Sequence, residues 1–289
     1  MIMEENSELK SNEQENTELN KDTNQTSIDP VVISPELRTD GHYVDVQKVK
    51  TTADRIQQEM DKVVVGNYAT VELLMAALFT GGHVLIEGLP GIAKTLTAKL
   101  LAKTIDADFS RIQFTPDLMP TDITGTSVFN MKESNFYFRK GPLFSNVILV
   151  DEVNRAPAKT QAALMEVMEE HQLTYDGVTY PMEFPFFIMA TQNPVEQEGT
   201  YSLPEAQLDR FVFRIKVGYP NLAGEEQILK RFQSDFKGVV SETVNAVCSK
   251  EDLKEFMQLI EKVRIEDSAL KYIASIVHNT RNNGDIFLG

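Results

Sequence analysis

The chain has 289 residues, 42% of them hydrophobic and 25% charged, and a formal net charge of −15. This length allows one large or two modest domains with a real core. The acidic charge argues against a general affinity for nucleic acid, which needs clustered Lys and Arg. The sequence contains no run of ~18 apolar residues, the length needed to span a membrane, and no secretory signal is visible. A single cysteine, Cys248, fits a reducing compartment, so we expect a cytoplasmic protein without an internal disulfide or a structural zinc site.

The first 43 residues differ in composition from the rest of the chain. They are rich in Glu, Asn, Thr and Ser and hold few large apolar groups. Such a segment buries too little surface to offset its ordering entropy, so residues 1–43 are predicted to form a disordered acidic tail. A solvated tail without a task is favoured over a docking or regulatory tail.

From residue 44 onward, helices and strands alternate. Two helices come first, at 46–65 and 68–79. Strands are predicted at 83–87, 109–114, 147–150, 186–191 and 211–217, with helices at 96–104 and 157–171. The alternation is typical of a parallel sheet flanked by helices, so residues 44–218 are predicted to form an α/β domain. Three further helices, at 223–232, 250–263 and 267–281, predict a small helical module over residues 219–289.

A strand, a glycine-containing loop ending in Lys-Thr and a helix together indicate a P-loop. Backbone N–H groups of such a loop and of the first helical turn bind phosphate. The candidate nucleotide-binding residues are Gly88, Leu89, Pro90, Gly91, Ile92, Ala93, Lys94, Thr95 and Leu96. Lys94 would contact the β- and γ-phosphates of a nucleotide, and the Thr95 hydroxyl would ligate Mg²⁺. The alternative is an ordinary tight turn between a strand and a helix.

Ala93 departs from the usual P-loop pattern, which has a second glycine at this position. Because alanine carries a Cβ and tolerates positive φ poorly, we expect Ala93 to adopt a right-handed conformation.

Two acids end the buried strand at 147–150. Ligands of parallel sheets bind beyond the carboxyl ends of the strands, where Asp151 and Glu152 would lie. Asp151 would hold Mg²⁺, usually through water, and Glu152 would act as general base on the attacking water. Alone, two acids after a strand are common in turns and helix caps, but a P-loop upstream favours the functional interpretation.

Two more polar residues end strands further along. Asn193 could reach the attacking water and the γ-phosphate if its strand lies between the two loops above, although Asn-Pro is also simple turn chemistry. Arg210 could reach the γ-phosphate of a neighbouring subunit, or it could form an exposed ion pair with Asp209. Arg155 is a second candidate for contact between subunits.

Together these motifs resemble the AAA+ ATPases and, among them, the MoxR family. The matching stretches are Glu87 to Thr95, Gln113 to Gly125, Asp151 to Pro157, Thr191 to Tyr201 and Pro204 to Phe211. Ala93 fits the MoxR version of the loop, Glu-Gly-x-Pro-Gly-x-Ala-Lys-Thr. The resemblance covers the chain from about Val44 to its end. It implies an AAA+ P-loop NTPase fold, with residues 219–289 as a partial α-helical lid.

The resemblance also assigns roles to particular residues. It makes Asn193 the sensor 1 residue and Arg210 the arginine finger. It places a helix-2 insert at residues 131–144 and a hairpin turn at 175–180, where Asp-Gly between β-formers independently predicts a turn. MoxR-like chains usually continue from an Ile-x-Leu-Gly stretch into a Ser-Pro-Arg motif with the sensor 2 arginine, whereas this sequence ends at residues 286–289.

The implied function is ATP hydrolysis with Mg²⁺ by a homo-oligomeric ring, expected to be a hexamer, that remodels or matures a protein client. Proteins with von Willebrand factor A domains are the implied partners. One alternative is a nucleotide-dependent assembly or scaffold module with little turnover, because the sensor 2 arginine is missing from the sequence. Another is a ring motor of the same clade that acts on DNA or inserts metal, which the acidic charge disfavours.

Overall fold

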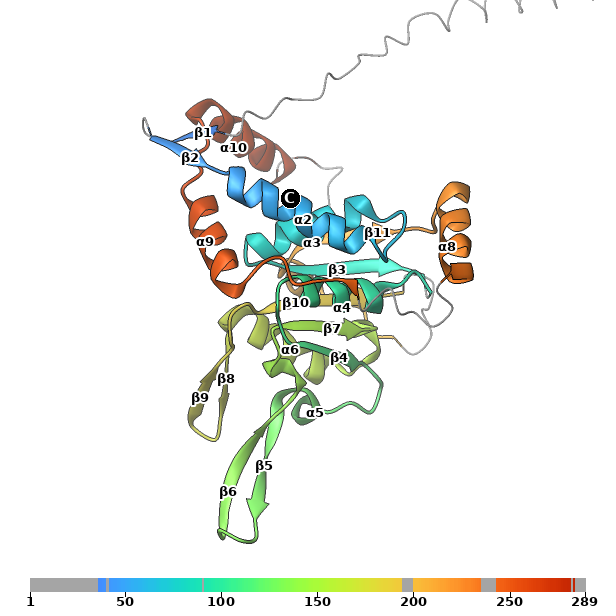
Figure 1. The fold of residues 1–289 in the computed structure, drawn as a ribbon. Coiled ribbons are helices and arrows are strands. Elements are labelled where there is room, and N and C mark those ends of the chain that lie inside the picture. The colour runs from blue at the N-terminus through green and yellow to red at the C-terminus, as the bar shows by residue number, and fades with distance from the viewer. Residues whose placement is uncertain are drawn as a thin grey trace, which may run out of the picture. The chain divides into compact units, whose positions relative to one another are not determined.

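The computed structural model describes residues 36–39, 42–89, 91–193, 200–234, 243–281 and 283. Its centre is a five-stranded sheet with the strand order β11-β3-β10-β7-β4 (Figure 1). The strands are β3 (His83–Gly88), β4 (Phe109–Gln113), β7 (Val147–Asp151), β10 (Phe187–Gln192) and β11 (Phe211–Val217). All neighbouring pairs run parallel. The predicted α/β fold and its five strands are therefore confirmed, and the strand ends differ from the prediction by one residue at most.

The central strands β3, β7 and β10 are buried on both faces because helices cover both faces of the sheet. In β3, Val84 and Ile86 belong to one core cluster, and Leu85 between them belongs to the other. The first cluster packs the sheet against α2 (Gln47–Asp61), α3 (Tyr68–Phe79) and α4 (Lys94–Thr104). The second packs it against α5 (Pro120–Thr124) and α6 (Ala158–Glu170). Within the described part of the chain, no helix is long and apolar enough to cross a membrane.

His83 begins β3 as a buried, neutral histidine. The backbone N–H of Ile188 donates to its Nδ1 atom (3.1 Å), so the ring proton lies on Nε2, which faces the carbonyl oxygen of Met168 at 3.4 Å. Burial lowers the pKa of His83 from 6.5 to about 4, and the nearby His171 ring adds to the lowering. The neutral ring thus joins β3, β10 and the end of α6.

This histidine predicts a pH dependence of stability. Its pKa is lower in the folded chain, so the unfolded chain binds more protons between pH 6.5 and 4. The free energy of unfolding is therefore fully supported above pH 6.5 and falls by ~3 kcal/mol as the pH approaches 4. Urea unfolding from pH 7.5 to 4.5 should show a shallower pH dependence for His83→Phe than for the wild type. Parallel curves would contradict this assignment.

Three antiparallel strand pairs lie in the described part of the chain, besides the central sheet. They are formed by β1 (Glu36–Thr39) with β2 (His42–Asp45), β5 (Gly125–Asn130) with β6 (Asn135–Lys140), and β8 (Gln172–Tyr175) with β9 (Val178–Pro181). The predicted turn of the last hairpin is confirmed, because Asp176 and Gly177 both have positive φ (51° and 75°), as a type I′ turn requires.

The other two hairpins depart from the predictions. Strand β1 and the first half of β2 lie inside the predicted tail, where residues 36–39 and 42–43 form strands, whereas residues 1–35, 40 and 41 lie outside the described part. The β5–β6 hairpin covers much of the predicted insert at 131–144 but begins earlier, at Gly125. That glycine has a φ of +105°, and a Cβ there would lie 2.3 Å from the carbonyl oxygen of Arg139. The hairpin thus depends on a close backbone approach that hydrophobic periodicity does not reveal.

The C-terminal helices are α8 (Leu222–Ser234), α9 (Lys250–Glu261) and α10 (Asp267–Arg281), close to the predicted ranges. Their packing differs from that of a separate module over 219–289. Cys248, Leu253 and Phe256 are buried in the same cluster as α2 to α4, and the Phe256 ring contacts Phe79 edge-on at 5.7 Å. The segment around α9 is therefore part of the core of the α/β domain.

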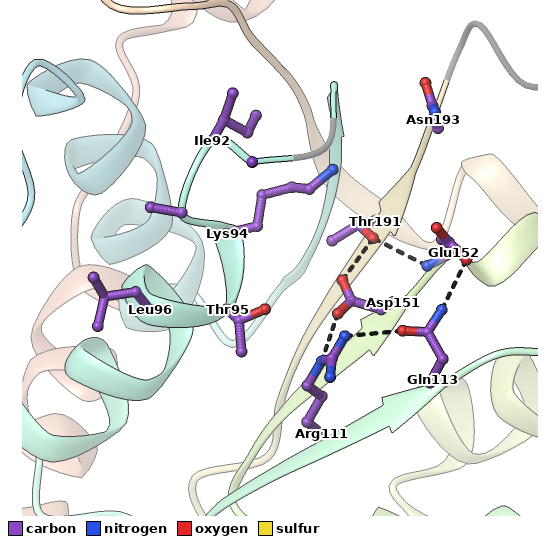
Figure 2. A pocket seen from close by; sticks show the side chains of 12 residues that line it. Ile92, Lys94, Thr95, Leu96, Arg111, Gln113, Asp151, Glu152, Thr191 and Asn193 are labelled. Atoms are coloured by element: carbon purple, nitrogen blue, oxygen red, sulfur yellow. Dashed lines mark hydrogen bonds and ion pairs between the residues drawn. The ribbon is translucent and has the colours of Figure 1, made fainter. Parts of the chain in front are cut away.

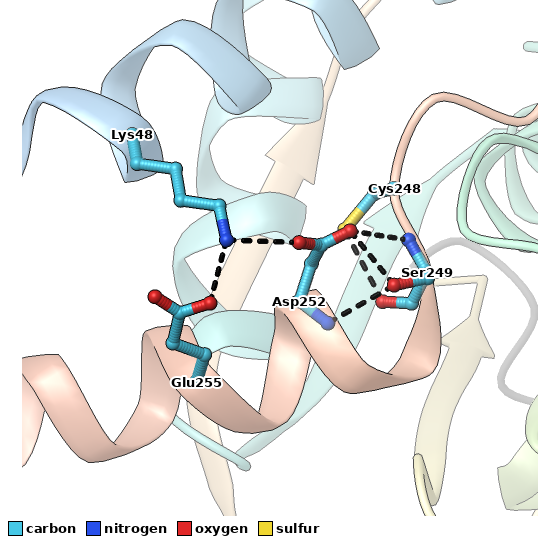
Figure 3. A network of polar contacts seen from close by, with 5 residues as sticks. All are labelled: Lys48, Cys248, Ser249, Asp252 and Glu255. Atoms are coloured by element: carbon cyan, nitrogen blue, oxygen red, sulfur yellow. Dashed lines mark hydrogen bonds and ion pairs between the residues drawn. The ribbon is translucent and has the colours of Figure 1, made fainter.

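A polar network also fastens α9 to α2 (Figure 3). The Lys48 ammonium lies 3.1 Å from Asp252 and 2.5 Å from Glu255. Asp252 in turn accepts the N–H and hydroxyl hydrogen bonds of Ser249, which caps the helix. This first turn of α9 is thus fixed by both apolar and polar contacts to the sheet domain.

Candidate nucleotide-binding site

The loop between β3 and α4 has little room for side chains. Gly88 ends β3, and a Cβ there would lie 2.4 Å from the Ile92 Cδ1 atom and 2.8 Å from the carbonyl oxygen of Val217. Gly91 has a φ of +86°, which favours glycine. Both glycines are thus required by the backbone path. Pro90 lies outside the described residues.

The expectation that Ala93 adopts a right-handed conformation is wrong. Its φ and ψ are 59° and 24°, in the left-handed region. Helix α4 begins directly after it, and its carbonyl oxygen accepts hydrogen bonds from the Thr97 backbone N–H (2.9 Å) and hydroxyl (3.1 Å). The chain must therefore turn sharply into the helix at Ala93, which costs about 1–2 kcal/mol at a non-glycine residue. Alanine keeps the side-chain contribution to this strain small.

Lys94 begins α4 and crosses the loop. Its ammonium donates a hydrogen bond to the carbonyl oxygen of Gly88 at 2.8 Å. Burial lowers the pKa of Lys94, and the carboxylates of Asp151 and Glu152 partly oppose this effect. The positive charge is therefore held inside the loop, on the side of the two acids.

One pocket of about 470 Å³ gathers most of the predicted site residues, a size usual for small-molecule sites (Figure 2). It is lined by Gly91, Ile92, Ala93, Lys94, Thr95, Leu96, Arg111, Gln113, Asp151, Glu152, Thr191 and Asn193. Lys94, Thr95, Asp151, Glu152 and Asn193, predicted from three separate motifs, thus lie around one space. Gly88 and Leu89 are not among its lining residues and belong to the loop behind it.

Asp151, at the end of β7, is buried and has hydrogen bonds to both carboxylate oxygens. The Thr191 hydroxyl donates to Oδ1 (3.0 Å), and the Arg111 Nε donates to Oδ2 (2.7 Å). A buried carboxylate needs such partners, because desolvation without them would be costly. The position of the carboxylate is therefore well defined.

Glu152 has a left-handed backbone conformation (φ 57°, ψ 50°), which turns the chain out of β7. Its N–H donates to the Thr191 hydroxyl at 3.0 Å. Its carboxylate accepts a hydrogen bond from the Gln113 amide (2.8 Å) and pairs with Arg155 (3.1 Å). Strain of this kind at a non-glycine residue often marks a functional site.

The position of β10 explains how distant motifs meet. It lies between β3 and β7 in the sheet. This is the condition under which Asn193 was predicted to reach the attacking water and the γ-phosphate. Asn193 follows the end of β10 and lines the pocket. Thr191, two residues earlier, joins Asp151 to Glu152 and was not predicted as a site residue. Thr191 lies at the end of a strand and opens the family-matching stretch Thr191 to Tyr201, and this position could have identified it as a site residue.

Arg111 and Gln113 of β4 are the other site residues that the sequence analysis missed. Gln113 pairs in register with Asp151 of β7, so its side chain lies beside the two acids. Residues two apart on a strand share a face, which brings Arg111 to the same pocket. Polar residues at alternating positions near a strand end were the signal that could have identified them.

The two arginines predicted to act between subunits differ in their distance from the pocket lining: Arg155 contacts a lining residue, and Arg210, among the described residues, does not. Arg210, after α7 (Glu205–Leu208), is not among the pocket-lining residues. It forms an ion pair with Glu169, not with Asp209 as the alternative interpretation had it, and it also donates to the carbonyl oxygen of Ala206 (3.3 Å). Arg155 pairs with Glu152 of its own chain. No described contact therefore brings Arg210 to the pocket of the same chain.

Behind the loop, a buried carboxylate connects three strands. Glu87 of β3 lies 2.5 Å from the Arg214 guanidinium of β11 and accepts a hydrogen bond from Gln192 of β10. Desolvation by burial would raise the pKa of Glu87, but the hydrogen bonds from Arg214 and Gln192 outweigh it, and the pKa is lowered. This charged pair supports the strand ends next to Gly88 and Asn193.

The residues present fit a magnesium ion held together with a nucleotide. Thr95 and Asp151 supply one hydroxyl and one carboxylate to the pocket. Among the described side chains, no group of three His, Cys, Asp or Glu could hold an ion by itself. Mg²⁺ typically binds one or two carboxylates plus substrate phosphates and keeps several waters, which matches this sparse oxygen donor set.

Comparison with known proteins connects this site to a family. Residues 83–213 match the model of the ATPase family associated with various cellular activities (AAA). The chain is 47% identical over 80% of its length to the uncharacterized protein YeaC of Bacillus subtilis, of which it covers 72%. It is also 47% identical to a crystallised candidate ATPase from Cytophaga hutchinsonii, with a TM-score of 0.73, covering 81% of this chain and 71% of the other.

Relatives with functional names match as well. The chain is 43% identical over 80% of its length to chaperone MoxR1 of Mycobacterium tuberculosis. It is 31% identical over 59% of its length to protein MoxR of Methylorubrum extorquens. It spans 60% of the first of these relatives and 51% of the second. The matches agree with the fold and the pocket: the chain belongs to the MoxR family of AAA+ ATPases.

Proposed function

We propose that the chain binds ATP with Mg²⁺ in the pocket between β3, β7 and β10 and hydrolyses it. The observation that carries this proposal is the meeting of Lys94, Thr95, Asp151, Glu152 and Asn193 around one space. A cation, a hydroxyl, two carboxylates and an amide are the groups that phosphoryl transfer to water requires. No one of the motifs would supply them alone.

The proposed roles follow from the position of each side chain. Backbone N–H groups at the start of α4 and the Lys94 ammonium bind the phosphates. Thr95 and Asp151 would hold the metal, which neutralises charge on the phosphates when bound. Glu152 accepts the proton of the attacking water, and Asn193 orients that water.

The nucleotide-dependent assembly alternative predicts binding without turnover. ATP binding by calorimetry and phosphate release, measured on the same preparation, separate the two. We expect Mg²⁺-dependent binding accompanied by phosphate release. Tight binding with no phosphate release would refute the enzymatic function and leave the assembly module.

Arg210 supports a multi-subunit arrangement, because it lies outside the pocket of its own chain. In a ring, which we propose to be hexameric, Arg210 of one subunit would stabilise charge at the neighbouring ATP. Arg210→Ala should lower turnover by ~10³-fold or more while leaving ATP binding intact. Mixing Arg210→Ala with Glu152→Gln subunits should restore part of the activity, because some interfaces then combine an intact Arg210 with an intact Glu152.

The matched control is Glu169→Ala, which removes the same ion pair and keeps the arginine. The pair is exposed, so its loss should change stability little. Equal loss of turnover in both variants would point to the ion pair instead of the finger. Mixtures that never regain activity would argue against action between subunits.

We further propose that ATP turnover is coupled to the remodelling or maturation of a protein client in the cytoplasm. The support is the name of one relative, chaperone MoxR1. The family resemblance adds proteins with von Willebrand factor A domains as candidate partners. Co-purification followed by mass spectrometry, with Glu152→Gln as a trap, would identify such clients.

A further inference from the structure

We propose that Arg111 is a positioning residue that competes with Mg²⁺ for Asp151. In the nucleotide-free site it would hold the carboxylate and lower the affinity for the metal. This inference rests on the proposed function, since it concerns the same pocket. None of the predicted motifs gives Arg111 a role.

The register of β4 places this cation beside the acid. Arg111 pairs with Leu149 of β7, and Gln113 pairs with Asp151. The Arg111 side chain therefore runs along the strand toward the end of β7, and its Nε atom donates to Asp151 Oδ2 at 2.7 Å. Figure 2 shows the guanidinium between Asp151 and Gln113, with hydrogen bonds to both side chains.

Each carboxylate oxygen of Asp151 already has a donor. Thr191 donates to Oδ1, and Arg111 donates to Oδ2. The side chain of Asp151 is only 10% exposed, whereas that of Arg111 is 48% exposed. The acid is thus fixed inside the sheet, and the arginine is the partner with room to move.

Arg111 also sets the orientation of Gln113. Its Nη2 atom donates to Gln113 Oε1 (2.9 Å), so the amide nitrogen of Gln113 points the other way and donates to Glu152 Oε2 (2.8 Å). An amide has one accepting and one donating end, and the arginine occupies the accepting end. The guanidinium therefore holds Asp151 directly and Glu152 through Gln113.

A dication and a guanidinium cannot both occupy this position without repulsion. Arginine does not lose its proton in proteins, so it cannot relieve the repulsion by deprotonation. Metal binding at Asp151 would therefore displace Arg111 from Oδ2, and this displacement would remove the donor that orients the Gln113 amide. Arg111 would thus couple metal binding to the orientation of Gln113, a hydrogen-bond partner of the proposed general base.

The test is a Mg²⁺ titration of nucleotide binding, which does not depend on turnover. A fluorescent ADP derivative is held at fixed concentration, and the half-saturating Mg²⁺ concentration is measured from the fluorescence. Arg111→Gln and Arg111→Met remove the charge, Arg111→Lys keeps it, and Arg139→Gln neutralises an exposed arginine of β6 as a control. Thermal melting in EDTA checks that each variant is folded.

The two neutral variants should need about fivefold less Mg²⁺ than the wild type, the equivalent of one partly exposed ion pair. Arg111→Lys and Arg139→Gln should stay within about twofold of the wild type. A half-saturating concentration that is unchanged or higher in both neutral variants would overturn the proposal. A wild type that binds no nucleotide at any Mg²⁺ concentration would instead refute the proposed function.

Discussion

Lys94→Ala should weaken ATP binding by about 10- to 100-fold, because hydrogen bonds to a charged group contribute about 1.5–3 kcal/mol. The Lys94 ammonium lies inside the phosphate loop, 2.8 Å from the Gly88 carbonyl oxygen, and faces the two acids of the site. No other lysine lines the pocket formed by the described residues. Calorimetry with ATP and Mg²⁺ measures the dissociation constant directly.

Lys99→Ala is the matched control, since Lys99 is exposed on the same helix, α4. Its ATP affinity should equal that of the wild type. Because Lys94 also contacts Gly88, thermal melting must show that Lys94→Ala is folded. A folded Lys94→Ala variant with wild-type affinity would show that the loop does not bind phosphate in the proposed way.

Glu152→Gln should lower ATP turnover by about 10²- to 10⁴-fold, the usual contribution of a general base. The amide keeps the size of the side chain and can still accept the hydrogen bond from Gln113. It cannot take the proton of the attacking water. The proposed metal ligands, Thr95 and Asp151, are untouched, so ATP affinity should change little and bound nucleotide should remain ATP.

Glu170→Gln provides the control, because Glu170 is an exposed carboxylate at the end of α6. Phosphate release and the identity of the bound nucleotide are measured for both variants. If Glu152→Gln hydrolyses ATP at the wild-type rate, another group is the base and the assignment of Glu152 is incorrect.

The sheet could be predicted because its signal is local. Runs such as residues 147–150 are apolar at every position, as strands covered on both faces must be. The strand order is not local, and Asn193 could be placed in the site only on condition that β10 lies between β3 and β7. The structure satisfies that condition.

The missed parts of the site depend on contacts between strands. Arg111 and Thr191 are ordinary polar residues in sequence, and only the pairing of β4 and β10 with β7 brings them to Asp151. The intrinsic preference of alanine against positive φ predicts the wrong conformation for Ala93. The turn from the loop into α4, which begins directly after Ala93, overrides that preference.

The helical C-terminal region also shows that a local sequence pattern does not reveal what an element packs against. A helix predicted at residues 250–263 matches α9 closely. The pattern does not say which surface the apolar face meets, and Phe256 packs against Phe79 of α3. Element type thus follows from sequence more readily than domain membership.

The most direct test of the central claim is a single-turnover experiment with radiolabelled ATP bound to the purified chain. The nucleotide is released by acid at successive times, and the ratio of ADP to ATP is measured with Mg²⁺ and with EDTA. If the five side chains around the pocket form a hydrolytic site, wild-type protein should convert its bound ATP to ADP only with Mg²⁺, while Glu152→Gln retains ATP. Wild-type protein that binds ATP with Mg²⁺ and returns it unchanged would contradict the account.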